Sequence, residues 1–283
     1  IGFGCESYAE FSGNENNRYA PHNKGGAFRR WAGNKDFVIK FDQKSYEALS
    51  SLCNRLASKS HYFRESLTWT EISSSTFSMR ALSPGYTFNI KGPSVFCDPD
   101  KRLALLGYFN SSTFGYLLGF LNQTISFNGG DVERVPFKEI SSYQLDEIKK
   151  NSSSCLRISQ LDLDSNETSW DFLCSQLTTI SAENVFSLEY SFMALISRNR
   201  ANIAEMIRLE EENNRFFIDA YGLTDVLSPC VPIEQISLSA NPSYRYGGNL
   251  SEEEQFSRVR FDTMAELISY AIGCMMGRYS LDE

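Results

Sequence analysis

Histidine is scarce in this sequence, with two residues, and the seven cysteines include no CxxC pair. The chain therefore has few residues that could bind zinc or act in histidine-based catalysis, and we expect no metal site. An odd number of scattered cysteines also argues against a disulfide framework. We expect buried free thiols and a reducing, cytoplasmic compartment.

Long apolar runs are also missing, because no stretch approaches the roughly 18 residues that a membrane span needs. The chain begins with Ile1, and no basic and apolar leader precedes a small-residue cleavage site. We expect a soluble segment cut from a longer protein, with no membrane partner. Its 283 residues, of which 42% are hydrophobic and 13% aromatic, suffice for one large domain or two ordinary ones.

Acidic residues outnumber basic ones, giving a net charge of -8, which by itself argues against nucleic acid. The distribution reverses this interpretation. Residues 1–138 hold 16 Lys and Arg against 12 Asp and Glu, a balance of +4, whereas residues 139–283 hold 11 against 23, a balance of -12. Within residues 18–102 the count is 14 against 7, or +7. Halves that differ this much are expected to face different partners.

Residue patterns predict a mixed α/β module over residues 1–138. Residues 1–36 are polar and glycine-rich and are expected to form loops. Short alternating or β-branched runs predict strands, and helical spacing predicts helices. The expected strands are 36–41, 76–82, 86–92, 94–96 and one beginning at 124, and the expected helices are 43–60 and a pair over 101–122 that breaks near Asn110.

Residues 139–283 are predicted to be a helical bracing or spacer region, so that the fold class is α+β. A helix over 141–150 precedes an acidic loop over 161–172. A long helix with an apolar seam is expected to begin at Ser181 and to stop at Gly222. The capping box of Ser251 and Glu254 predicts a last helix that runs to about residue 277.

The stretch ISLSANPSYRYG, Ile236–Gly247, contains Asn-Pro-Ser-Tyr, which is similar to the Asn-Pro-Pro-Tyr of enzymes that methylate amino groups on bases. Those enzymes hold the target amino group with the asparagine and stack the tyrosine on a flipped base. Ser243 loosens the motif here, and no Gly-rich turn for S-adenosylmethionine precedes Asn241. We therefore interpret this stretch as a turn and connector, with Tyr244 and Tyr246 packed against helices, and expect no catalytic residue or cofactor site.

Basic and aromatic residues interleave in the first half, as they do on surfaces that bind nucleic acid. Lysine and arginine neutralise phosphates, and arginine reads guanine edges. For any single residue, a solvated surface charge or a core aromatic is an equally good interpretation. The candidates for contact with DNA are Lys24, Arg29, Arg30, Lys35, Tyr62, Arg64, Trp69, Arg80 and Lys91.

Six stretches, in order along nearly the whole chain, resemble the part that follows the catalytic domain in adenine-specific DNA methyltransferases of BREX (phage-growth-limitation) defence systems. They are NKGGAFRRWAGN, YFRESLTWTEISS, DLDSNETSWDF, NRFFIDAYGL, ISLSANPSYRYG and ISYAIGCMMGRYSLD. Leu163 stands where we associate an aromatic residue with this family. Residues 105–137 also resemble the end of a target-recognition domain of restriction-modification specificity subunits.

This resemblance implies a DNA target-recognition fragment of a site-specific N6-adenine methyltransferase. The S-adenosylmethionine and catalytic motifs of the parent would lie upstream of Ile1, so the fragment alone is expected to be inactive. Its implied partners are double-stranded DNA, the upstream catalytic domain and other defence-system proteins. The alternative is a protein-interaction module of the same complex that does not touch DNA.

Overall fold

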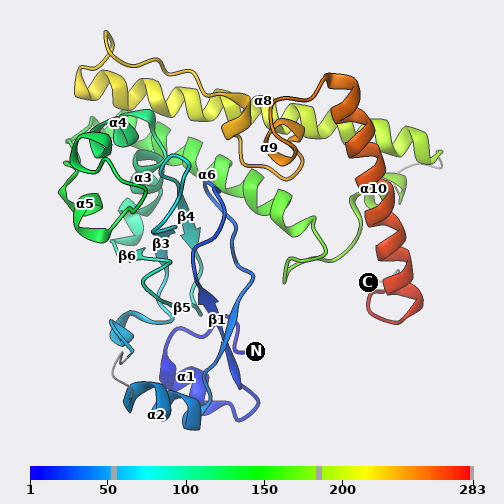
Figure 1. The fold of residues 1–283 in the computed structure, drawn as a ribbon, viewed down its shortest axis with the longest axis horizontal. Coiled ribbons are helices and arrows are strands. Elements are labelled where there is room, and N and C mark those ends of the chain that lie inside the picture. Colours follow the sequence, from blue (N-terminus) through cyan, green and yellow to red (C-terminus); the bar gives the residue numbers. More distant parts are fainter. Residues whose placement is uncertain (52–55, 183–186, 281–283) are drawn as a thin grey trace. The chain divides into compact units, whose positions relative to one another are not determined.

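Residues 1–51, 56–182 and 187–280 are described by the computed structural model, which has α+β architecture as predicted (Figure 1). The chain divides into two units. The first holds residues 1–156 and 212–229, and the second holds residues 157–211 and 230–283. No helix in the described ranges combines the length and apolarity that a membrane crossing requires.

Short strands of the first unit form two three-stranded sheets with the orders β2-β1-β5 and β4-β3-β6. The strands are β1 (Tyr19–Asn23), β2 (Val38–Lys40), β3 (Ser66–Trp69), β4 (Met79–Leu82), β5 (Thr87–Phe88) and β6 (Ser94–Val95). β1 is antiparallel to β2 and parallel to β5. β3 is antiparallel to both β4 and β6. Every strand expected between residues 36 and 96 is present, each shorter than predicted.

The helices that lie wholly within the first unit are short. They are α1 (Tyr8–Gly13), α2 (Gln43–Ser51), a 3-10 turn (Lys59–His61), α3 (Pro99–Phe109), α4 (Ser112–Leu121) and α5 (Gly129–Arg134). Ser111 lies in the predicted break between α3 and α4, and its hydroxyl accepts the N–H of Phe114. For the helix predicted over 43–60, residues 52–55 lie outside the described residues.

Two sequence predictions for this unit are wrong. Residues 1–36 contain α1 and β1 rather than loops alone. The strand expected from Thr124 forms only an isolated bridge at Ser126. The Gly129-Gly130 pair that follows begins α5, because the Asn128 side chain accepts the N–H of Asp131 and caps the helix.

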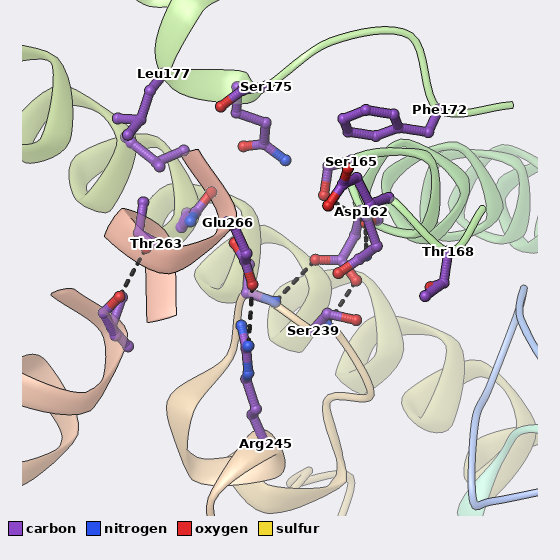
Figure 2. Close-up of a pocket in the computed structure, with 17 residues that line it drawn as sticks. Asp162, Ser165, Thr168, Phe172, Ser175, Leu177, Ser239, Arg245, Thr263 and Glu266 are labelled. Carbon is purple, nitrogen blue, oxygen red and sulfur yellow. Dashed lines mark hydrogen bonds and ion pairs between the residues drawn. The ribbon is translucent and has the colours of Figure 1, made fainter. Parts of the chain in front are cut away.

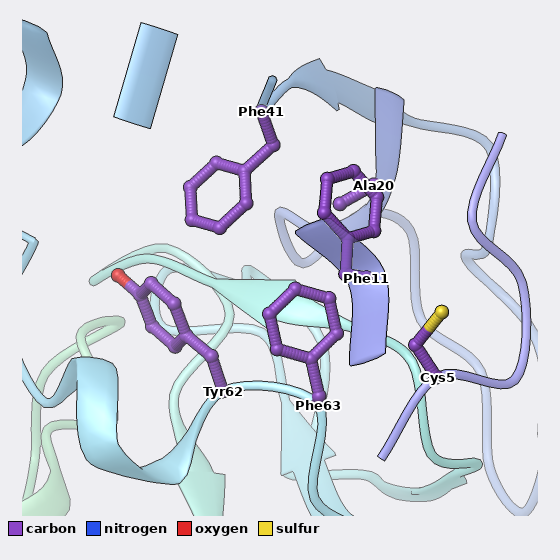
Figure 3. Packing of buried hydrophobic residues seen from close by; sticks show 6 residues of the cluster. All are labelled: Cys5, Phe11, Ala20, Phe41, Tyr62 and Phe63. Atoms are coloured by element: carbon purple, nitrogen blue, oxygen red, sulfur yellow. The ribbon is translucent and has the colours of Figure 1, made fainter. Parts of the chain in front are cut away.

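Aromatic side chains dominate the core beside the β2-β1-β5 sheet (Figure 3). Phe11, Phe41 and Phe63 are each at most 1% exposed. Their ring centroids lie 5.6–6.0 Å apart, as expected for tilted and edge-to-face packing. Tyr62 completes the cluster against Phe41.

Long helices make up most of the second unit. It contains the last part of α6 (Ser142–Asp164), α7 (Gln176–Ala182), most of α8 (Leu188–Tyr221), a 3-10 turn (Ile233–Gln235), α9 (Pro242–Arg245) and α10 (Glu252–Met275). The capping box at Ser251 is present, and α8 stops before Gly222, whose φ is +67°. Both ends were predicted. Ser181 lies within α7 and does not cap the long helix, and α6 runs on into the expected acidic loop.

The Asn241 side chain organises the connector between α8 and α10. It is fully buried, its amide N–H groups donate to the carbonyls of Ile233 and Ile236, each at 2.8 Å, and its oxygen caps α9 by accepting the N–H of Ser243. Tyr246 donates to Asp262 of α10 at 2.7 Å. The interpretation of this stretch as a structural turn is confirmed.

Replacement of Asn241 by alanine is expected to lower the free energy of unfolding by about 2–3 kcal/mol, because two buried carbonyls lose their donors and a helix loses its cap. Urea denaturation followed by circular dichroism measures this loss. Ser243→Ala is the matched control, since Asn241 contacts the backbone of Ser243. Equal stability of the two variants would show that the amide is dispensable.

Candidate nucleic-acid interface

The β1–β2 loop, residues 24–37, carries an unusual concentration of left-handed backbone. Gly25, Gly26 and Gly33 have φ values of +81°, +139° and +130°. Trp31 and Asn34, at +69° and +57°, adopt the same region although they have side chains. A bulky residue with positive φ persists only where its surroundings enforce that conformation, so this loop has a specified shape.

The Arg80 side chain of β4 holds part of the loop in this conformation. It is 1% exposed, and its guanidinium donates to the Arg29 carbonyl and to the Thr70 hydroxyl, both at 3.3 Å. The same hydroxyl donates to the Gly26 carbonyl at 3.0 Å. Trp31 pairs through its backbone with Met79 and Ala81, on either side of Arg80. A buried cation therefore fixes two points of the loop.

Close backbone contacts join the loop to the β5–β6 turn, residues 89–92. A Cβ on Gly25 would lie 2.4 Å from the Lys91 carbonyl oxygen, a distance that only glycine permits. The buried Asn23 amide donates to the Gly92 carbonyl at 2.9 Å and to Thr68 at 2.6 Å. The turn and the loop thus form one packed structure.

The segment that leaves β3, residues 70–73, lies between this turn and residues 125–127. The Glu71 N–H donates to the Lys91 carbonyl at 3.2 Å, and the Glu71 carbonyl accepts the N–H of Phe127 at 2.6 Å. Ser73 donates to Ile125 at 3.0 Å. We call residues 24–37, 70–73, 89–92 and 125–127 together the loop cluster.

Exposed cations and exposed aliphatic side chains share this cluster. Lys24 and Lys91 are exposed; Lys24 lies 4.9 Å from the ring centroid of Phe37, and Lys91 pairs with Glu71 at 2.7 Å. Ile90 is 72% exposed. Such a surface offers ammonium groups to phosphates and apolar tips to bases.

The candidates proposed from sequence fall into three groups by burial. Tyr62, Trp69, Arg30 and Arg80 are buried; Arg29 and Lys35 are half-buried; Lys24, Arg64 and Lys91 are exposed. A buried side chain reaches DNA only if the structure rearranges. The indole N–H of Trp69 illustrates this, since it donates to the Phe127 carbonyl at 2.7 Å.

Tyr62 and Arg64 belong to different surroundings from the other candidates. Tyr62 packs in the aromatic core, where burial raises its pKa. The Arg64 guanidinium lies 5.6 Å from the ring centroid of Phe96. The remaining candidates lie in the loop cluster or directly beneath it.

Sequence reasoning missed the exposed isoleucines of the cluster. Ile72 and Ile125 are 49% and 61% exposed, and Ile90 stands in the run predicted as a strand. Its place between Asn89 and Lys91-Gly92 was a usable signal, because Asn and Gly at these positions are typical of a turn.

Burial also affects the histidine next to the loop. His22 contacts the Thr87 hydroxyl through Nδ1 at 2.9 Å. Desolvation, and secondarily the charge of Lys24, lower the pKa of His22. The imidazole is therefore neutral at neutral pH and adds no charge to the cluster.

A polar pocket of about 300 Å³ lies in the second unit (Figure 2). The Asp162 carboxylate accepts the N–H groups of Ser239 and Ala240 at 2.6 and 2.9 Å. Arg245 lies 3.0 Å from the Glu266 carboxylate. Each of these charged groups already has a partner in the chain. The contacts of Asp162 hold the backbone of the connector that precedes α9.

Comparison with known proteins gives two relatives that match nearly the whole chain. It is 32% identical over 273 residues to the adenine-specific methyltransferase BrxX of Escherichia coli O9:H4 (strain HS), and 34% identical over 273 residues to the adenine-specific methyltransferase PglX of Lacticaseibacillus casei (strain Zhang). The matches cover 95% and 93% of this chain but 22% and 21% of the relatives. The chain thus spans about a fifth of their length. No family profile matches it.

Replacing Arg80 with methionine is expected to loosen the β1–β2 loop and to lower the free energy of unfolding by about 2–3 kcal/mol, because the Arg29 carbonyl and the Thr70 hydroxyl lose a charged donor. Hydrogen exchange of the amides of residues 25–34 measures the loosening. Arg64→Met, at an exposed position, is the control and should leave these rates unchanged. Unaltered exchange in Arg80→Met would exclude the supporting role.

Proposed function

We propose, from the homology of this chain to a segment of BREX adenine-specific methyltransferases, that it recognises the DNA target of such an enzyme. The name of each relative describes a methyltransferase, and an enzyme that modifies chosen adenines needs a surface that reads the duplex. The loop cluster is the surface of this chain that is best suited to that task.

The observation that carries the proposal is the construction of the cluster. A buried arginine and left-handed backbone hold Lys24 and Lys91 outward, within the segment of residues 18–102 whose charge balance is +7. A surface that only needs solubility requires no such enforced shape. Shape matters where side chains must meet particular phosphates and base edges.

We assign direct contact to the exposed or half-buried candidates and support to the buried ones. The contacting set is Lys24, Arg29, Lys35, Arg64 and Lys91, and the supporting set is Arg30, Tyr62, Trp69 and Arg80. The pairing of Lys91 with Glu71 does not oppose contact, because the Lys91 side chain remains half exposed and its ammonium group has three donors.

Methyl transfer is assigned to the remainder of the parent enzyme, where S-adenosylmethionine would bind. The residues of the Asn-Pro-Ser-Tyr stretch do not fit that reaction, because the Asn241 amide is used by Ile233, Ile236 and Ser243. An acceptor site for an exocyclic amino group needs a free amide oxygen facing a cavity. This chain therefore contributes recognition and no chemical step.

The second candidate function is protein contact by the helical part of the chain, without DNA binding. It is favoured by the acidic balance of residues 139–283 and by exposed apolar side chains on α10, such as Phe261 and Met275 at 75% and 79% exposure. Apolar exposure of this kind marks interaction surfaces. Charge reversal at Lys24 and Lys91 separates the two functions, since it abolishes DNA affinity only under the first.

Lys91→Gln is expected to weaken binding to duplex DNA about fivefold near 0.1 M salt and to reduce the slope of log affinity against log salt by about one, because one phosphate contact is lost. Fluorescence anisotropy at several salt concentrations measures both. Lys150→Gln is the matched control: Lys150 is exposed and pairs with Glu147 at 2.6 Å, as Lys91 pairs with Glu71 at 2.7 Å. Equal effects of the two variants, or binding without salt dependence, would contradict the proposal.

A further inference from the structure

Ile90 occupies the tip of the β5–β6 turn and is the most exposed isoleucine among the described residues, at 72%. An aliphatic side chain left in water forgoes the stabilisation that burial would provide. A turn tolerates almost any polar residue at this position. The side chain is therefore available to an apolar partner outside the chain.

The turn that carries Ile90 is braced on both sides. The Asn89 side chain accepts the Lys91 N–H at 2.9 Å, and Gly92 donates to the Asn89 carbonyl at 3.1 Å. The Lys91 carbonyl accepts from Glu71, and a Cβ on Gly92 would lie 2.7 Å from the Asn23 amide. A tip fixed in this way holds its side chain outward at little cost in conformational entropy.

Lys91, the residue that follows Ile90, indicates the chemistry of the partner. Lys91 is exposed, so the turn presents an aliphatic group and an ammonium group next to each other. Duplex DNA offers the complementary pair, because base faces are apolar and the phosphates beside them are anionic. Apolar side chains, isoleucine included, insert between base steps in proteins that unstack or kink DNA.

We propose that Ile90 is a wedge that enters the base stack and stabilises an opened step of the duplex. The inference rests on the proposed function and extends it from binding to deformation. It also suits adenine modification, because chemistry on a base requires that base to leave the stack. Lys91 then anchors the wedge to the neighbouring phosphate.

The test compares two 20-base-pair duplexes of one sequence, one fully paired and one with a single central T·T mismatch. An opened step already meets part of the cost of unstacking, so the wild-type 283-residue chain should prefer the mismatched duplex by about 5- to 10-fold. Ile90→Ser should remove the preference and keep the salt dependence of binding to the paired duplex. Ile90→Leu, which retains an aliphatic tip, should keep the preference.

Ile268→Ala serves as the matched control, because Ile268 is 60% exposed on α10 in the second unit. Its preference should equal that of the wild type. A wild-type chain without preference, or Ile90→Ser with the preference intact, would overturn the wedge while leaving salt-dependent DNA binding standing. Absence of salt-dependent binding to both duplexes would instead overturn the proposed function on which the wedge rests.

Discussion

A buried cation, Arg80, underlies the surface to which we assign recognition. The Arg80 guanidinium lies below the β1–β2 loop and donates to the Arg29 carbonyl and the Thr70 hydroxyl. Burying an arginine is costly unless acceptors replace water. Here those acceptors belong to the loop and to the segment that leaves β3, so the cation and the loop conformation require each other. Removal of the guanidinium takes a charged donor from both the Arg29 carbonyl and the Thr70 hydroxyl.

The residues that fix the shape of the loop are therefore different from the residues proposed to contact DNA. Left-handed Gly25, Gly26 and Trp31 are tolerated because the sheet below them holds the chain. The side chains of Lys24 and Lys91 are exposed, so they do not hold the loop conformation as Arg80 does. Phosphate binding needs only a cation within reach, whereas base reading needs side chains held to within about half an ångström. Under the proposed function, the buried arginine therefore supports recognition through the shape of the loop rather than through its own charge.

Local signals explain which parts of the fold were predictable. The capping box at Ser251 identifies the start of α10, because both of its hydrogen bonds lie within four residues. β1 was missed because it lies in the polar, glycine-rich stretch of residues 1–36, where local composition favours loops. The burial of Arg80 was not predictable either, since its acceptors stand 51 and 10 residues away in sequence. The exposure of Ile90 likewise depends on a turn whose bracing comes from distant segments.

Two of the six segments that carry the resemblance to the methyltransferases are under clear backbone constraint. NKGGAFRRWAGN contains the left-handed residues of the β1–β2 loop, and ISLSANPSYRYG contains the buried Asn241. Both are recognisable because glycine and a fully engaged asparagine have few substitutes there. Exposed positions such as Lys24, Ile90 and Lys91 carry no such constraint. A scaffold of this kind can change what it contacts while its loops keep their form. Under the proposed function, the identity of the scaffold and the choice of DNA site are therefore carried by different residues.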